Sequence, residues 1–201
     1  MTLNPNHGFL LTVAVFRPGG HQILTGDGNG QIEVWNAATG AKRVLGRPGP
    51  GINDLEFNNR GTQFVTASDS GVVTVWDAGD DRPVRSINAC PSPSTASFSP
   101  DGSKIVVACG NGGAPVFEVA TGQQLTVLEG ANVGEVNSAA FSPDGKSIVT
   151  TFDADNMGGV SIWSSELATT SLPALERIAE HRVTRRLTPA ERLEYLTGVS
   201  G

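Results

Sequence analysis

Short runs of alternating apolar and polar residues recur along the first 163 residues, separated by turns rich in Gly, Pro, Asn and Asp. Alternation with a period of two predicts β-strands that bury one face. The runs come in four groups, and we expect strands over 11–16, 22–25, 32–35 and 42–45; 52–57, 63–67, 72–76 and 84–87; 96–98, 104–108, 115–119 and 124–128; and 136–141, 147–151 and 160–163. The pattern therefore predicts an all-β chain up to residue 163.

The four groups repeat one plan. A Phe precedes the first turn of each group, and an aromatic residue closes the third strand: Phe16, Phe57, Phe98 and Phe141, followed by Trp35, Trp76, Phe117 and Trp163. The Phe residues are 41, 41 and 43 residues apart. A repeat of about 40–45 residues that contains several short strands indicates a β-propeller, in which each repeat forms one four-stranded blade.

The residues between the first and second strands agree with this interpretation. Ser-Pro-Asp-Gly at 99–102 and at 142–145 places Pro where φ is fixed and Gly where φ is positive. Asp101 and Asp144 are therefore expected to be structural residues of tight turns.

These residues resemble the WD-repeat (β-transducin-like) family. The turn F-S-P-D-G, a strand, a Gly-rich turn and a closing V-x-x-W-[DN] follow the order of a WD repeat, and Trp76-Asp77 is the dipeptide itself. The resemblance covers about residues 9–163 and implies about four blades, over roughly 9–45, 52–87, 95–128 and 136–163, within a propeller domain at 1–171. The His of the family's internal hydrogen-bond network has no counterpart here, but Thr25 with Trp35, and Thr66 with Trp76, can keep part of that network.

The last blade is incomplete. Residues 164–171 show no turn and strand like those that end the earlier groups, and nothing before Leu11 replaces them. Propellers of this family usually have about seven blades, so we interpret the chain as the C-terminal part of a longer propeller or as one half of an assembled ring. Open edges of this kind predict self-association.

From residue 172 the hydrophobic period becomes helical, and we expect a short helical tail over 172–201. Thr188-Pro-Ala-Glu191 matches a capping box with Pro at the first helical position. The stretch RVTRRLTPAERLEYL resembles tails that close bacterial multidomain WD-repeat proteins. That resemblance implies a signalling or other effector module elsewhere in a larger protein.

Charge and composition narrow the range of partners. The net charge is −6, which argues against nucleic-acid binding. No apolar run reaches the roughly 18–20 residues that cross a membrane, and residues 1–8 lack a secretory signal, so we expect a cytoplasmic protein. The two cysteines, Cys90 and Cys109, are expected to be small apolar residues and not a disulfide framework.

No catalytic, metal or cofactor site is expected. The three histidines, His7, His21 and His181, have no ligand or triad spacing with a nucleophile. Residues 153–158 resemble the start of a calcium loop, but Met157 takes a ligand position and Ser164 stands where the loop needs Glu. We therefore expect neither an enzyme nor a small-molecule substrate.

The leading hypothesis is a non-catalytic protein-interaction scaffold or sensor module. The resemblance implies that the loops at 46–52, 89–95 and 130–136 share one face with those at 27–30, 69–71, 110–113 and 153–159. The polar candidates for binding a protein partner on that face are Arg47, Asn53, Asn132, Asp153 and Asp155. The alternatives are a self-assembling half-propeller with a mainly structural role, and a propeller hydrolase or lyase, for which the acidic residues Asp54, Glu56 and Glu135 are too scattered.

Overall fold

The computed structural model describes residues 8–129, 134–154 and 157–166. The chain divides into two compact units, Met1–Thr169 and Thr170–Gly201, and every described residue belongs to the first. The predicted helical tail at 172–201 lies outside the described residues. None of the described helical segments has the length and apolar character needed to cross a membrane.

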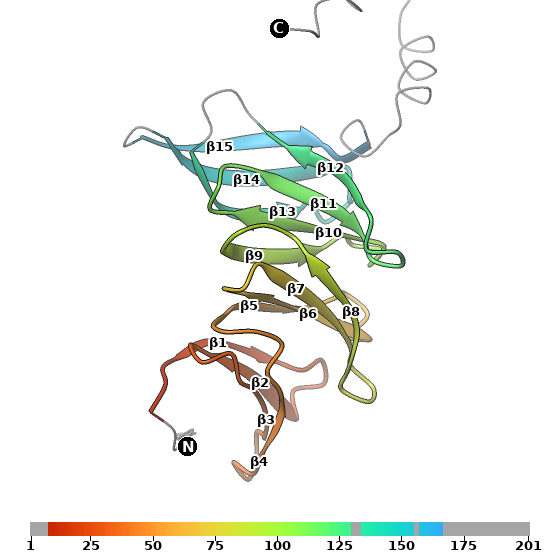
Figure 1. The fold of residues 1–201 in the computed structure, drawn as a ribbon. Coiled ribbons are helices and arrows are strands. Elements are labelled where there is room, and N and C mark those ends of the chain that lie inside the picture. Colours follow the sequence, from red (N-terminus) through yellow and green to blue (C-terminus); the bar gives the residue numbers. More distant parts are fainter. Residues whose placement is uncertain (1–7, 130–133, 155–156, 167–201) are drawn as a thin grey trace, which may run out of the picture. The chain divides into compact units, whose positions relative to one another are not determined.

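Four antiparallel sheets follow one another along the chain, which confirms the four predicted blades (Figure 1). Blade 1 contains β1 (Leu11–Phe16), β2 (Gln22–Asp27), β3 (Ile32–Asn36) and β4 (Lys42–Gly46). Blade 2 contains β5 (Ile52–Phe57), β6 (Gln63–Ser68), β7 (Val72–Asp77) and β8 (Arg82–Asn88). Blade 3 contains β9 (Pro93–Phe98), β10 (Lys104–Cys109), β11 (Ala114–Glu118) and β12 (Gln124–Leu128). Blade 4 contains β13 (Glu135–Phe141), β14 (Ser147–Ala154) and β15 (Met157–Ser164).

Blade 4 has three strands among the described residues, as the sequence predicts. Its hairpin, however, is longer than expected. The segment 153–159 was expected to be a loop, but β14 and β15 continue through the pairs Asp153↔Gly158 and Ala154↔Met157. The expectation was wrong because strand pairing satisfies backbone groups that a loop would leave to water.

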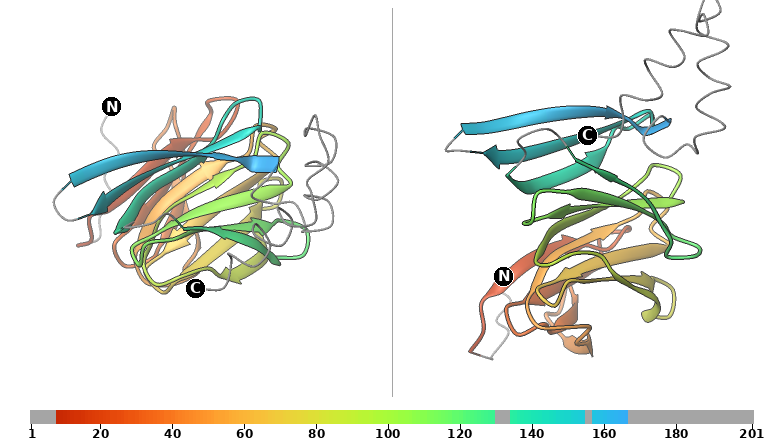
Figure 2. Two further views of the ribbon diagram at one scale, coloured as in Figure 1. Left: turned by 90° about the horizontal axis from the view of Figure 1, so that it is seen from above. Right: turned by 45° about the horizontal axis from the view of Figure 1, so that its top comes forward.

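The blades pack face to face, and each contact buries one apolar cluster. The inner strands β1, β5, β9 and β13 lie side by side in that order (Figure 2). Between blades 1 and 2 the cluster is built on Leu24, Ile32, Ile52 and Trp76. Between blades 2 and 3 it includes Val65, Val75, Ile105 and Phe117, and between blades 3 and 4 it includes Val106, Val116, Ala139 and Ile148. Most of the repeated aromatic residues therefore belong to the blade contacts: Trp76, Phe98 and Phe117 lie in the clusters, and Phe57, Phe141 and Trp163 pack against them, whereas Phe16 of blade 1 is exposed.

The expected remnant of the family's polar network is present. Trp35 Nε1 donates to Thr25 Oγ1 at 2.9 Å, and Trp76 Nε1 donates to Thr66 Oγ1 at 3.1 Å. Blade 4 repeats the bond between Trp163 and Thr150 at 3.0 Å. Each bond satisfies an indole N–H that packing removes from water.

The Ser-Pro-Asp-Gly turns also form as predicted. Gly102 and Gly145 have φ of +75° and +70°, values that favour Gly. Asp101 Oδ1 accepts hydrogen bonds from Ser99 Oγ at 2.6 Å and from the Ser103 amide at 3.0 Å. These bonds to the charged form lower the pKa of Asp101 to about 2, with the Ser99 bond as the largest cause.

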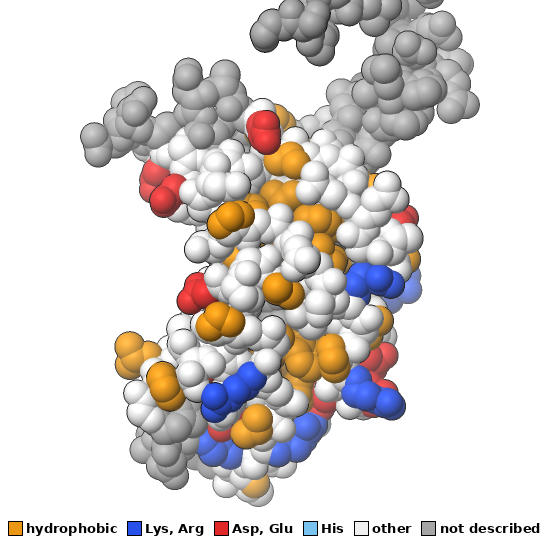
Figure 3. All heavy atoms as spheres, viewed as in Figure 1, with side chains coloured by type: hydrophobic (Ala, Val, Ile, Leu, Met, Phe, Trp, Pro, Cys, Tyr) orange, Lys and Arg blue, Asp and Glu red, His pale blue; other side chains and the backbone are white. Residues whose placement is uncertain are grey.

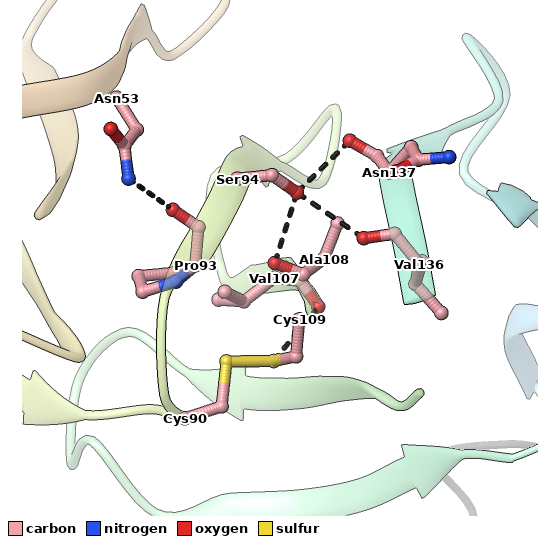
Figure 4. The surroundings of a disulfide bond; sticks show 9 residues. All are labelled: Asn53, Cys90, Pro93, Ser94, Val107, Ala108, Cys109, Val136 and Asn137. Carbon is pink, nitrogen blue, oxygen red and sulfur yellow. Dashed lines mark hydrogen bonds between the residues drawn. A yellow bond between two sulfur atoms is a disulfide. The ribbon is translucent and has the colours of Figure 1, made fainter. Parts of the chain in front are cut away.

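Cys90 and Cys109 form a disulfide, so the expectation of two separate apolar residues was wrong (Figure 4). Cys90 lies in the connection from β8 to β9, and Cys109 is the last residue of β10. Antiparallel pairing places Cys109 opposite Pro93, and the two cysteine Cα atoms are 6.0 Å apart. That distance lies within the range that a disulfide bridges, and it depends on strand pairing that a spacing of 19 residues does not reveal.

Candidate functional site

The turns between second and third strands lie beside the connections that join one blade to the next. Ser68 Oγ donates to the Pro50 carbonyl at 2.7 Å, and the Asp69 amide donates to the Gly51 carbonyl at 2.9 Å. On the other side of this turn, the Ala89 amide donates to the Gly71 carbonyl at 2.9 Å. We name this end of the blades the loop face, and it comprises residues 27–31, 46–53, 68–71, 89–95 and 109–113.

One close approach on the loop face requires Gly. Gly30 has φ of +82°, and a Cβ atom built there would lie 1.7 Å from the Gly49 carbonyl oxygen. A larger residue at position 30 would therefore push the β2–β3 turn away from the blade 1 to blade 2 connection. The loop face is held together by backbone contacts as well as by side chains.

Two Asn–Asp pairs occupy equivalent places at the inner edge of this end. Asn53 Nδ2 donates to Asp69 Oδ1 at 2.8 Å and to the Pro93 carbonyl at 3.0 Å. Asn137 Nδ2 donates to Asp153 Oδ2 at 2.9 Å. Asn53 and Asp153 are site residues predicted from the sequence, whereas their partners Asp69 and Asn137 are not. The missed signal is the spacing, because both pairs are 16 residues apart and both Asn residues stand four positions before the repeated Phe.

Of the remaining candidates, one lies on the loop face and two lie outside the described residues. Arg47 is exposed, and its Nη2 donates to Gln31 Oε1 at 2.7 Å. An arginine carries five N–H donors, so this bond leaves donors for a partner. Asn132 and Asp155 lie outside the described residues.

Side chains of each inner strand bond to the backbone of the next one. Thr12 donates to the Ile52 carbonyl, Asn53 to the Pro93 carbonyl, and Ser94 to the carbonyls of Val136 and Asn137 at 3.3 and 2.9 Å (Figure 4). The donors Thr12, Asn53 and Ser94 are spaced by 41 residues, the period of the repeat. The contacts between blades are therefore fastened at one repeated position.

The carboxylates of β5 serve the same contact. Asp54 Oδ2 accepts from the Ala96 amide at 2.9 Å, and Glu56 Oε1 accepts from the Phe98 amide at 3.1 Å. Burial removes water from both groups and raises the pKa of Asp54 and of Glu56, although these hydrogen bonds act in the opposite direction. Their role in the structure is to bind β9. In the part of the chain that the structure describes, no group of three or more His, Cys, Asp or Glu side chains could hold a metal ion.

Arginines join the blades at the end opposite the loop face. Arg17 and Arg43 of blade 1 both pair with Asp81 of blade 2. Arg85 of blade 2 donates to three carbonyls of the β11–β12 turn, those of Val119, Ala120 and Thr121. On the side shown in Figure 3, basic and acidic side chains are interspersed with hydrophobic groups.

Consecutive antiparallel sheets, in which the third-strand Trp bonds to a second-strand Thr, define a propeller-like class of all-β proteins. Two segments match a protein-family model described as WD domain, G-beta repeat, at residues 42–77 and 122–157. The chain therefore contains WD repeats, and its four consecutive antiparallel sheets are consistent with a WD-repeat propeller fold. No curated protein sequence matches the chain.

The first matched segment begins at β4 and ends with β7, so the sequence repeat is offset from the structural blade. This repeat takes the outer strand of blade 1 and three strands of blade 2, which ties the two blades together covalently, and the second match runs from the turn before β12 to the first residue of β15. WD repeats in general indicate a protein-interaction scaffold.

Proposed function

We propose that the loop face docks a protein partner, with the blades acting as a rigid, non-catalytic scaffold or sensor. The observation that carries the proposal is that the β6–β7 turn is hydrogen-bonded on both sides, to residues 50–51 on one side and to Ala89 on the other. This turn presents the exposed residues Asp69 and Ser70 in fixed positions. Loops that are ordered before binding lose little conformational entropy when a partner arrives.

The surface chemistry favours a protein over a nucleic acid or a small substrate. The net charge of −6 opposes phosphate binding, and the loop face offers amide, hydroxyl and carboxylate groups together with Arg47. The inner-strand acids Asp54 and Glu56 are bonded to β9 amides, which disfavours the hydrolase or lyase alternative.

We further propose that the chain is the C-terminal part of a larger bacterial signalling or regulatory protein and works in the cytoplasm. The support is the sequence resemblance of the tail at 182–196. The disulfide makes the opposite prediction for location, because cytosolic thiols are normally kept reduced. Alkylation of free thiols in intact cells, followed by mass analysis of the chain, decides between the two. Two alkylated cysteines fit the cytoplasm, and none fits an oxidising compartment.

Self-association through the open edges is a second candidate, in which the role is mainly structural. It is favoured by β15, which ends the three-stranded sheet of blade 4. The two roles are compatible, because the loop face lies at the strand ends and the open side of blade 4 lies on its sheet.

The docking proposal is tested by affinity capture with three versions of the full chain. The loop-face variant carries Arg47→Glu and Ser70→Arg, at two exposed positions. The matched control carries Arg60→Glu and Asp80→Arg, exposed positions on turns at the opposite end. We expect a partner that the parent and the control retain and the loop-face variant loses. Equal capture by all three proteins would contradict docking through this face.

A further inference from the structure

The three contacts between consecutive blades, which we call joints, share one construction. The side of each blade that faces the next blade presents three apolar positions on its second and third strands. In blades 1 to 3 these positions are almost fully buried, with exposed fractions of 0–3%: Leu24, Ile32 and Val34; Val65, Val73 and Val75; Val106, Ala114 and Val116. The joint is therefore a repeated apolar contact with the same positions in every blade.

In the part of the chain that the structure describes, the same three positions of blade 4 are exposed. Strand pairing places Val149 opposite Ile162, as Val106 lies opposite Val116 in blade 3, and Val160 corresponds to Ala114. Their exposed fractions are 38% for Val149, 77% for Ile162 and 65% for Val160. This side has the apolar composition of a joint, and in the described part of the chain it stays exposed.

Blade 1 presents the complementary half on its inner strand. The positions that accept the preceding blade are buried in blade 2 at Leu55 (2%), in blade 3 at Ala96 (0%) and in blade 4 at Ala139 (2%). The equivalent residue of blade 1, Ala14, is exposed, and the repeated Phe of this blade, Phe16, is 63% exposed. Trp35, farther out on the same sheet, is 2% exposed, so the free area is the inner part around β1.

We propose that blade 4 of one copy binds blade 1 of a second copy and forms a further joint of the same kind. This inference rests on the self-association candidate under the proposed function. A second copy of the chain is the expected partner because the chain carries both surfaces of a joint, one on blade 4 and one on blade 1. Its three internal joints show that surfaces of this kind fit together. In the new joint Asn137 takes the place of Thr12, Asn53 and Ser94, four positions before the repeated Phe. It donates to the carbonyl of the partner subunit's Leu11, the position equivalent to Ile52 and Pro93.

The number of blades favours a closed pair. A contact between two different surfaces either closes into a ring or continues as a filament. Two copies joined at both ends contain twice the four blades that the structure describes, and propellers typically have about 4–8 blades. Such a ring covers the exposed sides of both described end blades, blade 1 and blade 4.

The test measures the mass of the full chain in solution by light scattering in line with gel filtration. We expect the parent at twice the 20.9 kDa chain mass. Ile162→Asp places a carboxylate on the open side of blade 4, and Phe16→Asp does so on blade 1. Each variant alone is expected at the single-chain mass, because both joints of a homodimer would then contain the charge. The matched control Val84→Asp, at a 53% exposed position on the outer strand β8, should keep the double mass.

Mixing the two variants separates this arrangement from those in which blade 4 meets blade 4 or blade 1 meets blade 1. In an equimolar mixture, one joint of a mixed pair combines both charged halves and the other joint is unchanged. Head-to-tail docking therefore predicts that the mixture recovers pairs, each containing one copy of each variant. A dimeric Phe16→Asp protein would overturn the proposal and indicate contact between two copies of blade 4.

A parent at the single-chain mass would also overturn the proposal. Circular dichroism and thermal melting check that the variants fold, and Ile162→Ser with Phe16→Ser provide uncharged replacements if either Asp variant does not. Loop-face capture provides the separate readout for the proposed function. A monomer that still captures a partner through Arg47 and Ser70 would reject the joint and keep the docking role.

Discussion

The disulfide gives the sharpest quantitative prediction about stability. It joins the connection that enters blade 3 to the end of β10, over a sequence separation of 19 residues. In the chain-entropy treatment, closing a loop of about 20 residues in the unfolded state stabilises the fold by about 3 kcal/mol at 25 °C. For a domain of this size, that free energy corresponds to a melting temperature higher by about 6–12 °C.

The perturbation is reduction of the bond, because reduction keeps both side chains in place. Urea unfolding of the parent, followed by tryptophan fluorescence, is compared with and without a phosphine reductant at constant pH. We expect the unfolding free energy to fall by about 3 kcal/mol on reduction. The control is the double variant Cys90→Ala, Cys109→Ala, whose unfolding should not respond to the reductant. Cys109 is fully buried, so this variant should also be less stable than the reduced parent.

Two results would refute this reasoning. Equal midpoints for the oxidised and reduced parent would show that the bond does not constrain the unfolded chain as the entropy treatment requires. Two alkylated thiols in the purified, unreduced protein would show that Cys90 and Cys109 are not joined. The second result would return the cysteines to the small apolar role that the sequence alone suggested.

Three further predictions concern the core and the pH dependence of stability. Trp76→Ala should lower the unfolding free energy by about 3–5 kcal/mol, because Trp76 is 3% exposed and stacks on Phe64 with ring centroids 5.5 Å apart. A variant that melts like the parent would contradict the blade assignment. The pKa of Asp101 is lowered from 3.8 in the unfolded chain to about 2 in the fold. The ionised carboxylate therefore stabilises the fold above about pH 4, and this contribution is lost as the pH falls from about 4 to 2. In urea unfolding across that range, the unfolding free energy of Asp101→Asn should fall less steeply with pH than that of the parent. The pKa values of Asp54 and Glu56 are raised above 3.8 and 4.5, so acidification from neutral pH should increase their contribution to stability. The double variant Asp54→Asn, Glu56→Gln should lose that increase and should be no less stable than the parent at neutral pH. A marked loss of stability at neutral pH would show that the charges themselves hold β9.

Much of the fold follows from local signals in the sequence. The four groups of strands and the Ser-Pro-Asp-Gly turns were predicted correctly, because period-two alternation and turn chemistry act over a few residues, whereas the loop expected at 153–159 is part of a longer hairpin. The repeated Phe and Trp residues set the register between blades, and the sequence shows their spacing directly. The predicted Trp–Thr bonds also form, since each joins paired positions of one hairpin.

The site depends much more on tertiary structure. The sequence analysis placed Asn53 and Asp153 on the binding face, but the structure shows that each belongs to an Asn–Asp pair that holds the inner edge. Asp54 and Glu56 were considered as scattered acids, whereas both bind amides of the neighbouring blade about 42 residues away in sequence. The order of the inner strands decides these contacts.

The sequence by itself determined the repeat, the blade count and the apolar sides of the blades, because each is written in the residue types of one short segment. Only the tertiary structure decided that Cys90 meets Cys109, that one side-chain position fastens every joint, and that the apolar sides of blades 1 to 3 are covered while that of blade 4 is exposed. The physical reason is that these properties belong to pairs of segments. Which segments become neighbours is settled by the packing of whole sheets against one another.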